Sequence, residues 1–435
     1  MYSELLKEKI KNRTATIGVI GLGYVGLPLS VEMAKAGFNV IGFDVQASKV
    51  EMVNRGQNYI SDVLSSDLAS IVASGRLRAS DDYSLIGGCD CVSICVPTPL
   101  DIYQQPDISY VEASAKAVAE YAHVGMLVIL ESTTYPGTTQ EIIQPLLTQK
   151  GLNVGEDIFL AFSPERIDPG NKQYKTKNTP KVVGGVTCAC TELAALLYGS
   201  FLEGGICSVS SPKVAEMEKI LENTFRNINI ALANEMAILC NRMGISIWEV
   251  IDAAATKPYG FMAFYPGPGL GGHCIPLDPF YLTWKARAYN YHTRLIEIAG
   301  EINNGMPEYI VERVSRMLNR TKKPLNGSRV FLLGVAYKPD IDDLRESPVL
   351  KIIALLEKEG AEVICNDPYI PSFKVGGAEY LSTEITEKSM SSADIVVITT
   401  NHSCYDIGFI TANAKAVFDT RNATKEANGE NIERL

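Results

Sequence analysis

The 435-residue sequence has no uninterrupted apolar run of about 18 residues, so it offers no candidate for a membrane-spanning helix. The charged N-terminus, Met1 to Arg13, lacks the apolar stretch of a secretory signal peptide. Basic residues are not in excess: the formal net charge of −10 argues against general binding to nucleic acid or anionic membranes. A local basic pocket could still bind phosphate. The apolar content of 46% is that of a well-buried globular protein, and the length predicts two or three domains.

The spacings typical of disulfide frameworks and metal sites are also missing. Ten cysteines are scattered along the chain, and the pairs Cys89/Cys91 and Cys188/Cys190 are separated by one residue, whereas zinc ligands are separated by roughly two to four residues. Four histidines show no ligand spacing: His123, His273, His292 and His402. We therefore expect no metal site and a reduced, cytoplasmic compartment.

A dinucleotide-binding fingerprint lies near the N-terminus. The pattern predicts a strand over Thr16–Ile20, the turn Gly21–Gly26, a helix over about 27–35, and a second strand over 38–43 that ends at Asp44. This is the G-x-G-x-x-G motif between strand and helix, followed by an acid about 20 residues on. The glycines let a pyrophosphate approach the helix N-terminus. Asp44 should bind ribose hydroxyls and repel a 2′-phosphate, which favours NAD over NADP; the alternative is a simple turn residue.

Residues 267–279 indicate covalent chemistry. Their sequence is Gly-Pro-Gly-Leu-Gly-Gly-His-Cys-Ile-Pro-Leu-Asp-Pro, which surrounds Cys274 with glycines and prolines and places Asp278 four residues later. Glycines remove side chains that would stop a ligand from reaching the thiol, and prolines stiffen the loop. An open thiol near a carboxylate suits nucleophilic catalysis. The alternative is a small buried apolar residue, as most free cysteines are.

A long helix is predicted from Ser210 or Ser211, either of which can cap it, to Gly244, which can end it. About 30 residues would span roughly 45 Å, enough to bridge two domains. A polar row follows its length: Glu216, Lys219, Asn223, Asn227 and Asn234. Solvated faces are usually rich in Glu and Lys rather than Asn, so we interpret the row as functional or as an interface, with a solvated face as the alternative.

Three further strands are predicted before this helix, at 91–96, 127–130 and 158–162, and the last leads into Ser163–Arg166. Ligands of open α/β sheets bind at the carboxyl ends of strands. The turns after the strands at 91–96 and 127–130 are therefore candidates for the nicotinamide side of the site.

Two helical regions are predicted after the cysteine loop, at about 281–304 and 307–319, and a second doubly wound unit begins near Pro324. Its predicted elements are strands at 329–334, 361–365, 394–399 and 416–419 and a helix at 348–359. The fingerprint is reduced to Gly-Val-Ala at 334–336, so this unit should bind a different ligand. Lys338 and Arg345 form a candidate phosphate clamp, and an ordinary charged loop is the alternative.

Five motifs, in order, extend a resemblance from about Thr14 to Thr420. They are Gly21–Pro28, Ser163–Arg166, Glu216–Lys219 with Asn223, Gly271–Cys274, and Tyr337–Asp340 with Arg345–Pro348. On these motifs the chain resembles the nucleotide-sugar 6-dehydrogenases of the UDP-glucose, UDP-N-acetylhexosamine and GDP-mannose group. The resemblance implies an α/β fold of two doubly wound, Rossmann-like domains joined by a long central helical region. It places an NAD-binding domain at 1–210, a central domain with the cysteine loop and a dimer interface at 211–322, and a UDP-sugar-binding domain at 323–435.

The resemblance also assigns roles to residues. The implied catalytic residues are Cys274 as nucleophile, Lys219 and Asn223 as a polar pair, Glu165 and Asp278 as proton-handling carboxylates, and Thr133 near the nicotinamide. The implied NAD contacts are Gly21, Gly23, Tyr24, Val25, Gly26, Asp44, Lys49, Pro97, Thr98, Thr133 and Arg345. The implied substrate contacts are Glu165, Arg166, Lys219, Asn223, Tyr265, Gly267, Gly271, Cys274, Lys338 and Arg421.

These roles predict oxidation of a sugar C6 alcohol to a carboxylate by two NAD, through a thiohemiacetal and a thioester on Cys274, for surface polysaccharide biosynthesis. The segments 258–266 and 275–282 resemble the bacterial branch that acts on UDP-N-acetylhexosamines. UDP-N-acetylglucosamine is the favoured substrate, while UDP-N-acetylgalactosamine, UDP-N-acetylmannosamine and UDP-glucose stay open. The alternatives from other classes are a β-hydroxyacid dehydrogenase and a non-catalytic nucleotide-sugar or NAD sensor. A homodimer is the expected assembly, without nucleic-acid or membrane partners.

Overall fold

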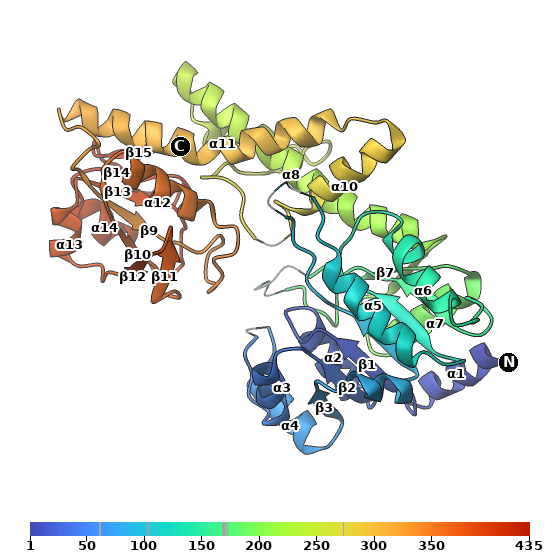
Figure 1. The fold of residues 1–435 in the computed structure, drawn as a ribbon. Coiled ribbons are helices and arrows are strands. Elements are labelled where there is room, and N and C mark those ends of the chain that lie inside the picture. Colours follow the sequence, from blue (N-terminus) through green and yellow to red (C-terminus); the bar gives the residue numbers. More distant parts are fainter. Residues whose placement is uncertain (61, 102, 104, 168–170, 172, 273) are drawn as a thin grey trace. The chain divides into compact units, whose positions relative to one another are not determined.

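The computed structural model describes residues 1–435 except 61, 102, 104, 168–170, 172 and 273, so His273 lies outside the described residues (Figure 1). The chain divides into two compact units. Unit 1 comprises Met1–Glu222 and Phe280–Tyr291, and unit 2 comprises Asn223–Pro279 and His292–Leu435. Each unit contains one parallel or mainly parallel sheet.

Unit 1 is built on an eight-stranded sheet with the order β3-β2-β1-β4-β5-β6-β7-β8. Its strands are β1 Thr16–Ile20, β2 Asn39–Phe43, β3 Leu77–Ser80, β4 Cys91–Ile94, β5 Leu127–Leu130, β6 Phe159–Phe162, β7 Lys181–Gly185 and β8 Ile206–Val209. Neighbouring strands are parallel except β6 and β7, which are antiparallel. The sequence analysis did not predict β3, β7 or β8.

Apolar clusters cover both faces of this sheet. Alternate residues of β6 enter different clusters: Phe159 joins one and Leu160 the other. The first cluster also contains residues of α2 and α7, and the second contains residues of α5. The helices of unit 1 are α1 Tyr2–Lys11, α2 Gly26–Lys35, α3 Ala47–Asn54, α4 Ser65–Ala73, α5 Ser109–Tyr121, α6 Gln144–Thr148 and α7 Cys188–Gly199, with short turns η1 Tyr83–Gly88 and η2 Thr139–Ile143. Burial on both faces explains the continuous apolar runs of the strands.

Unit 2 contains a parallel sheet with the order β10-β9-β13-β14-β15. Its strands are β9 Arg329–Leu333, β10 Glu362–Asn366, β13 Ile395–Ile398, β14 Val417–Asp419 and β15 Ile432–Arg434, and β11 Ser372–Val375 and β12 Ala378–Leu381 form a separate hairpin. The helices are α9 Ile247–Ala255, α11 Arg294–Arg320, α12 Pro348–Lys358, α13 Glu387–Ser392 and α14 Ile407–Asn413. Alternate residues of β9 again enter separate clusters, with α12 on one face and α14 on the other. The predicted fold class is confirmed.

The long helix α8 runs over Pro212–Met243 and is followed by Gly244 at a φ of +72°. Its polar row is buried: the residues are only 0–6% exposed, so the solvated-face alternative is wrong. The exposed side chains of α8 include charged residues, such as Arg226 and Glu235, and a stripe of large apolar ones: Val214, Met217, Leu221, Phe225, Leu232, Leu239 and Met243. The helix therefore turns its polar row toward the protein and an apolar stripe toward solvent.

The helices that follow the cysteine loop differ from the predicted ones. The segment expected at 281–304 is interrupted: α10 spans Asp278–Ala286, the turn η3 spans Arg287–Tyr289, and Asn290 has a φ of +53°. The break expected before Pro307 is absent, because Pro307 is a buried residue inside α11. Core packing of that helix outweighs the one backbone hydrogen bond that a proline removes.

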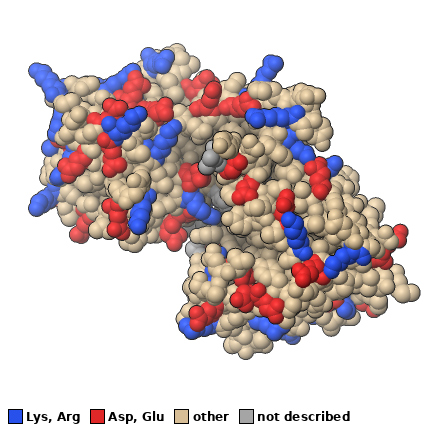
Figure 2. Space-filling model, in the orientation of Figure 1, with Lys and Arg blue, Asp and Glu red and all other residues tan. Residues whose placement is uncertain are grey.

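The described residues also show the composition of the helices and the distribution of surface charge. No helix in the described part of the chain is long and apolar enough to cross a bilayer. Acidic and basic side chains are interspersed on the face drawn in Figure 2. That distribution accords with the modest net charge of the sequence.

Buried asparagines connect α8, α11 and the cysteine loop within unit 2. The Asn234 side-chain amide donates to Asn303 Oδ1 (2.9 Å), and its oxygen accepts from the Gly267 N–H (3.0 Å). Asn303 in turn donates to the carbonyl of Asn227 (3.1 Å). Both asparagine side chains of this first pair are therefore satisfied without water.

Asn234→Ala is expected to lower the free energy of unfolding of unit 2 by about 1–3 kcal/mol, because it leaves buried polar groups of Gly267 and Asn303 without partners. Urea unfolding followed by Trp248 fluorescence measures this. The exposed neighbour provides the control, since Glu235→Ala should change stability by less than about 0.5 kcal/mol. Equal losses in both variants would contradict the role given to Asn234.

Candidate functional site

The glycines of the loop between β1 and α2 have two roles: some are needed to form the turn, and one leaves space for a ligand. Gly21 has a φ of +92°, and a Cβ there would lie 2.5 Å from the carbonyl oxygen of Cys95. A Cβ on Gly26 would lie 1.8 Å from the carbonyl oxygen of Gly21, so both positions are needed for the turn itself. A Cβ on Gly23 would meet nothing within 4 Å. The open space at Gly23 fits a pyrophosphate held by the backbone, as the expected NAD requires.

Asp44, directly after β2, is 6% exposed and is bound to this loop. Its Oδ2 accepts the Leu22 N–H and its Oδ1 the Gln46 N–H, both at 2.9 Å. Lys49 Nζ lies 3.7 Å from Oδ2. The carboxylate of Asp44 thus has a fixed orientation beside the loop, which a side chain that binds the ribose hydroxyls requires.

The other expected NAD residues of unit 1 lie at the same edge of the sheet. Tyr24 and Val25 are in the glycine loop, Pro97 and Thr98 follow β4, and Thr133 follows β5. Glu165 follows β6, which is parallel to β5. Because β2, β1, β4, β5 and β6 are consecutive neighbours and run in one direction, their carboxyl ends form one continuous edge.

Glu165 is held by its own loop and by a buried lysine. Its Oε1 accepts the N–H groups of Arg166 (2.7 Å) and Ile167 (3.0 Å). Its Oε2 lies 3.4 Å from Lys181 Nζ. The lysine also pairs with Glu131, at 2.5 Å. Sequence reasoning missed Lys181 and Glu131; each is a charged residue directly beside a fully buried apolar run, and that placement could have identified them.

The first turns of α8 bind two loops of unit 1. Glu216 accepts hydrogen bonds from the Gly137 N–H and from the Thr139 N–H (2.9 Å) and hydroxyl (2.7 Å), which fixes the loop after β5. The Arg166 guanidinium pairs with Glu222 and lies 3.5 Å from Glu218. Burial raises the pKa of Glu218 to about 7. Lys219, 6% exposed, lies between these acids on the same helix.

The cysteine loop of unit 2 is attached to α8. Cys274 is exposed, and its carbonyl oxygen accepts the N–H of Asp278 (2.9 Å) at the start of α10. The Asn223 amide donates to Asp278 Oδ2 (2.6 Å), and Asn227 donates to the Ile275 carbonyl (3.1 Å). Three of the expected catalytic residues, Cys274, Asp278 and Asn223, are therefore brought together by short hydrogen-bonded links.

The glycines of this loop have a packing role that sequence reasoning did not anticipate. A Cβ on Gly271 would lie 2.4 Å from Tyr337 Cβ, and one on Gly267 would lie 2.5 Å from the Arg421 guanidinium. The Gly272 N–H donates to the Arg345 carbonyl (2.9 Å). The loop thus packs directly on segments that carry expected substrate contacts, and only glycine permits that approach.

The remaining expected residues of unit 2 lie on or beside these segments. Lys338 is in the loop after β9, and the Arg345 guanidinium there binds Asp343 through two nitrogens, at 2.7 and 3.0 Å. Tyr265 donates to Asp252 (2.8 Å) and stacks on Trp248. Among the described residues, no group of His, Cys, Asp and Glu is arranged to hold a metal ion.

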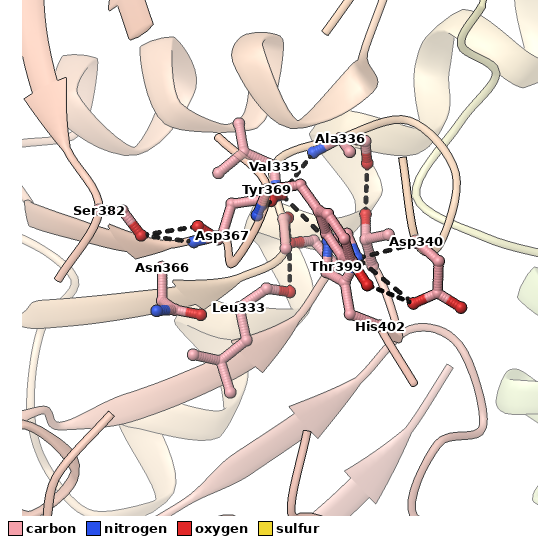
Figure 3. Close-up of polar contacts among 12 residues, drawn as sticks. Leu333, Val335, Ala336, Asp340, Asn366, Asp367, Tyr369, Ser382, Thr399 and His402 are labelled. Carbon is pink, nitrogen blue, oxygen red and sulfur yellow. Dashed lines mark hydrogen bonds and ion pairs between the residues drawn. The ribbon is translucent and has the colours of Figure 1, made fainter. Parts of the chain in front are cut away.

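The second sheet repeats the acid of the first, but its carboxylate is covered (Figure 3). Asp367 follows β10 as Asp44 follows β2, and its Oδ2 accepts the N–H groups of Val335 (2.7 Å) and Ala336 (2.9 Å). His402 Nε2 lies 3.0 Å from the same oxygen, and the Asp340 N–H donates to Nδ1 (3.0 Å). Since Nδ1 accepts, Nε2 carries the proton and donates to Asp367.

This contact has two consequences. Burial would raise the pKa of Asp367, but hydrogen bonds from His402 and from backbone N–H groups outweigh it and lower the pKa. His402 occupies the position beside the acid and holds Asp340, at a φ of +62°, in the loop that carries Lys338. Sequence reasoning missed His402 and Asp367. The two sheets thus share a plan, in which an acid after the second strand binds backbone N–H groups of the first loop, and in the second sheet His402 also binds that acid.

Comparison with known proteins identifies the family of the chain. Three domain descriptions of the UDP-glucose/GDP-mannose dehydrogenase family match the chain: the NAD binding domain at 15–202, the central domain at 213–305 and the UDP binding domain at 331–426. The chain is 37% identical over 388 residues to a UDP-N-acetyl-D-glucosamine 6-dehydrogenase of Pseudomonas aeruginosa, covering 89% of this chain and 90% of that protein.

Two further relatives are similar over nearly their whole length. A UDP-N-acetyl-D-mannosamine dehydrogenase of Pyrococcus horikoshii is 35% identical over 417 residues, 94% of this chain and 96% of that protein. A solved structure of a UDP-D-ManNAc dehydrogenase from the same organism superposes with a TM-score of 0.89 at 34% identity, covering 97% of this chain and 99% of that one.

The glycine loop predicts different results for two alanine variants. Gly26→Ala should lower the free energy of unfolding by about 1–3 kcal/mol or more, since its Cβ overlaps the Gly21 carbonyl. Gly23→Ala should leave stability within about 0.5 kcal/mol but weaken NAD binding, because the new methyl group fills the space for the pyrophosphate. Urea unfolding and a fluorescence titration with NAD measure both. Unchanged NAD affinity in Gly23→Ala would contradict this assignment.

Proposed function

The chain belongs to the UDP-glucose/GDP-mannose dehydrogenase family, and on that premise we propose that it oxidises a UDP-N-acetylhexosamine, with UDP-N-acetylglucosamine as the favoured sugar. It is an NAD-dependent UDP-sugar 6-dehydrogenase. The membership sets aside a β-hydroxyacid dehydrogenase and a non-catalytic sensor. We assign NAD to a domain at 1–210, the cysteine loop to a domain at 211–322 and the UDP-sugar to a domain at 323–435.

The names of the relatives support an N-acetylated sugar. Three relatives that are 35–37% identical to this chain are named for N-acetylglucosamine, N-acetylmannosamine and N-acetylgalactosaminuronic acid. The first of them has the highest identity to this chain among the three. UDP-N-acetylmannosamine, UDP-N-acetylgalactosamine and UDP-glucose are the alternative substrates, and the product would serve surface polysaccharide biosynthesis.

The observation that carries the mechanism is the exposed Cys274 beside the Asn223–Asp278 contact. When bound, NAD accepts a hydride at each of the two oxidations. The glycine loop and Asp44 would hold it, with Tyr24, Val25, Lys49, Pro97, Thr98, Thr133 and Arg345 as further contacts. The C6 hydroxyl loses its proton to Asp278, to Lys219 or to a bound water in the first oxidation.

Cys274 then retains the reactive aldehyde. Its thiolate adds to the aldehyde carbon and forms a thiohemiacetal, which the second oxidation converts to a thioester. A water activated by Glu165 or Asp278 attacks the thioester carbon, the C–S bond breaks, and the acid leaves as the thiol is restored. Lys219 and Asn223 stabilise the oxyanions, and loss of one such donor costs about 3–4 kcal/mol in the transition state. The remaining proposed substrate contacts are Arg166, Tyr265, Gly267, Gly271, Lys338 and Arg421.

The wild type is expected to form two NADH per UDP-N-acetylglucosamine consumed, because both oxidations take place before release. Cys274→Ala should abolish turnover, whereas Cys404→Ala, which removes another exposed thiol of unit 2, should not. NADH absorbance and sugar consumption, compared over the four candidate sugars, measure this. A tenfold or greater preference for UDP-glucose would overturn the N-acetyl assignment, and one NADH per sugar would overturn the thioester.

A homodimer through α8 and α11 is part of this proposal, as is a reducing cytoplasm, which suits the free cysteines. Leu232, Leu239 and Met243 of α8 are 46–61% exposed. A groove of about 640 Å³ between the helices is lined by Met236 and Leu239 and by charges of both signs: Glu235, Glu301 and Arg242. A second copy related by a two-fold axis would cover the apolar stripe and set acids against Arg242.

Leu239→Glu is expected to convert the dimer to a monomer, because it places a charge on the apolar stripe and in the groove. Size-exclusion chromatography with light scattering gives the mass. Leu381→Glu, at a 69% exposed position on β12, is the control and should keep the wild-type mass. A monomeric wild type, or a dimeric Leu239→Glu variant, would contradict this interface.

A further inference from the structure

Unit 1 contains a buried cluster of polar side chains that no step above uses. It consists of Glu131 after β5, Lys181 at the start of β7 and Tyr198 on α7. The side chains of Lys181 and Glu131 are 5% and 0% exposed, with Nζ 2.5 Å from Glu131 Oε2. The Tyr198 hydroxyl donates to the other oxygen of Glu131, and its ring centre lies 5.0 Å from Lys181 Nζ.

The reversal of strand direction in the sheet brings this cluster to Glu165. Since β7 runs antiparallel to β6, the first residue of β7 lies near the carboxyl end of β6, where Glu165 follows. Lys181 Nζ therefore reaches Glu165 Oε2, at 3.4 Å. A lysine at the start of a parallel strand would lie at the opposite edge of the sheet, away from the site.

Stability alone is a poor reason for such a cluster. Desolvation of a buried ion pair costs about as much as its attraction returns, and apolar replacements are often neutral or stabilising. Burial raises the pKa of Glu131. Burial by itself would lower the pKa of Lys181, but Glu131 and Glu165 outweigh it and raise the pKa, so the lysine stays charged. The fold therefore keeps a buried, charged lysine, Lys181, beside the proposed base Glu165.

We propose that Lys181, held in place by Glu131, is a positioning residue that supplies a positive charge beside the Glu165 carboxylate and fixes its orientation. This rests on the proposed role of Glu165 in activating water. Lys181 supplies the charge, and the N–H groups of Arg166 and Ile167 supply the direction by binding the second oxygen. Glu131 tempers the cation, because its negative charge also acts on Glu165.

The charged and titratable groups around Glu165 come from five elements. They are Glu131 after β5, Lys181 on β7, Tyr198 on α7, Cys95 after β4, and the neighbour Arg166, whose guanidinium is engaged by Glu218 and Glu222 of α8. Burial keeps Tyr198 and Cys95 neutral, since it raises the pKa of both groups. Changes at Lys181 and Glu131 are therefore the direct way to alter the charge at Glu165.

The test is the acid limb of the kcat–pH profile, below which the base is protonated. Lys181→Met should move this limb up by about one pH unit or more, because an opposite charge within about 4–6 Å favours the ionised carboxylate by about one to three units. Glu131→Gln should move it down, because the cation then acts on Glu165 alone. Lys181→Arg should stay close to the wild type. Shifts of the acid limb in opposite directions in Lys181→Met and Glu131→Gln are specific to the proposed role of Lys181, since a loss of packing alone would not shift the pH dependence of kcat.

The assay uses whichever of the four UDP-sugars the wild type oxidises fastest, so failure of the favoured sugar is distinguished from failure of this inference. Lys177→Met is the matched control: its lysine pairs with Glu203 at the surface (2.7 Å) and should leave the profile unchanged. If Lys181→Met does not fold, as judged by circular dichroism, Glu131→Gln decides alone. Loss of kcat with an unmoved limb, or displacement of both variants in one direction, would overturn the proposal.

Discussion

Burial of polar groups along α8 is the constraint on which the candidate site depends. A buried amide or carboxylate must find hydrogen-bond partners, and the acid and asparagines of the row find them in other segments. Glu216 binds the loop after β5, Asn223 binds Asp278, and Asn234 binds the loop that leads to Cys274. Movement of any of these segments would leave a buried group without a partner. Within each unit, the cost of that loss holds these loops on α8.

The two doubly wound sheets show how one plan serves two ligands. In both, an acid after the second strand binds backbone N–H groups of the first loop: Asp44 binds Leu22, and Asp367 binds Val335 and Ala336. The first loop has glycines and leaves space above them. In the second, His402 covers the acid, and longer side chains replace the glycines. The contact between the acid and the loop is thus structural in both sheets. The difference in ligand follows from the residues beside that contact, which are glycines in the first sheet and His402 with longer side chains in the second.

The strand reversal between β6 and β7 has a local chemical effect. It places Lys181 near the carboxyl end of β6, and the lysine pairs there with both Glu131 and Glu165. The exposed part of Glu165 is small, and its two oxygens have different partners. A carboxylate with one oxygen engaged by backbone and one by a cation has a defined direction. A general base on a loop needs such a fixed direction, because it must lie within hydrogen-bond reach of the proton that it removes.

The amino-acid sequence by itself determined most of the alternating strands and helices, the glycine loop with Asp44, the length of α8 and the family, because these depend on local periodicity and short-range motifs. It did not determine which face of α8 is buried, since a polar row is compatible with solvent or with a satisfied interior. Nor did it determine the continuity of α11 through Pro307, where packing outweighs a local preference. Lys181, Glu131, His402 and Asp367 acquire partners only when distant strands become neighbours. Only the tertiary structure could decide those contacts, because they join segments far apart in the chain, for which local patterns carry no information.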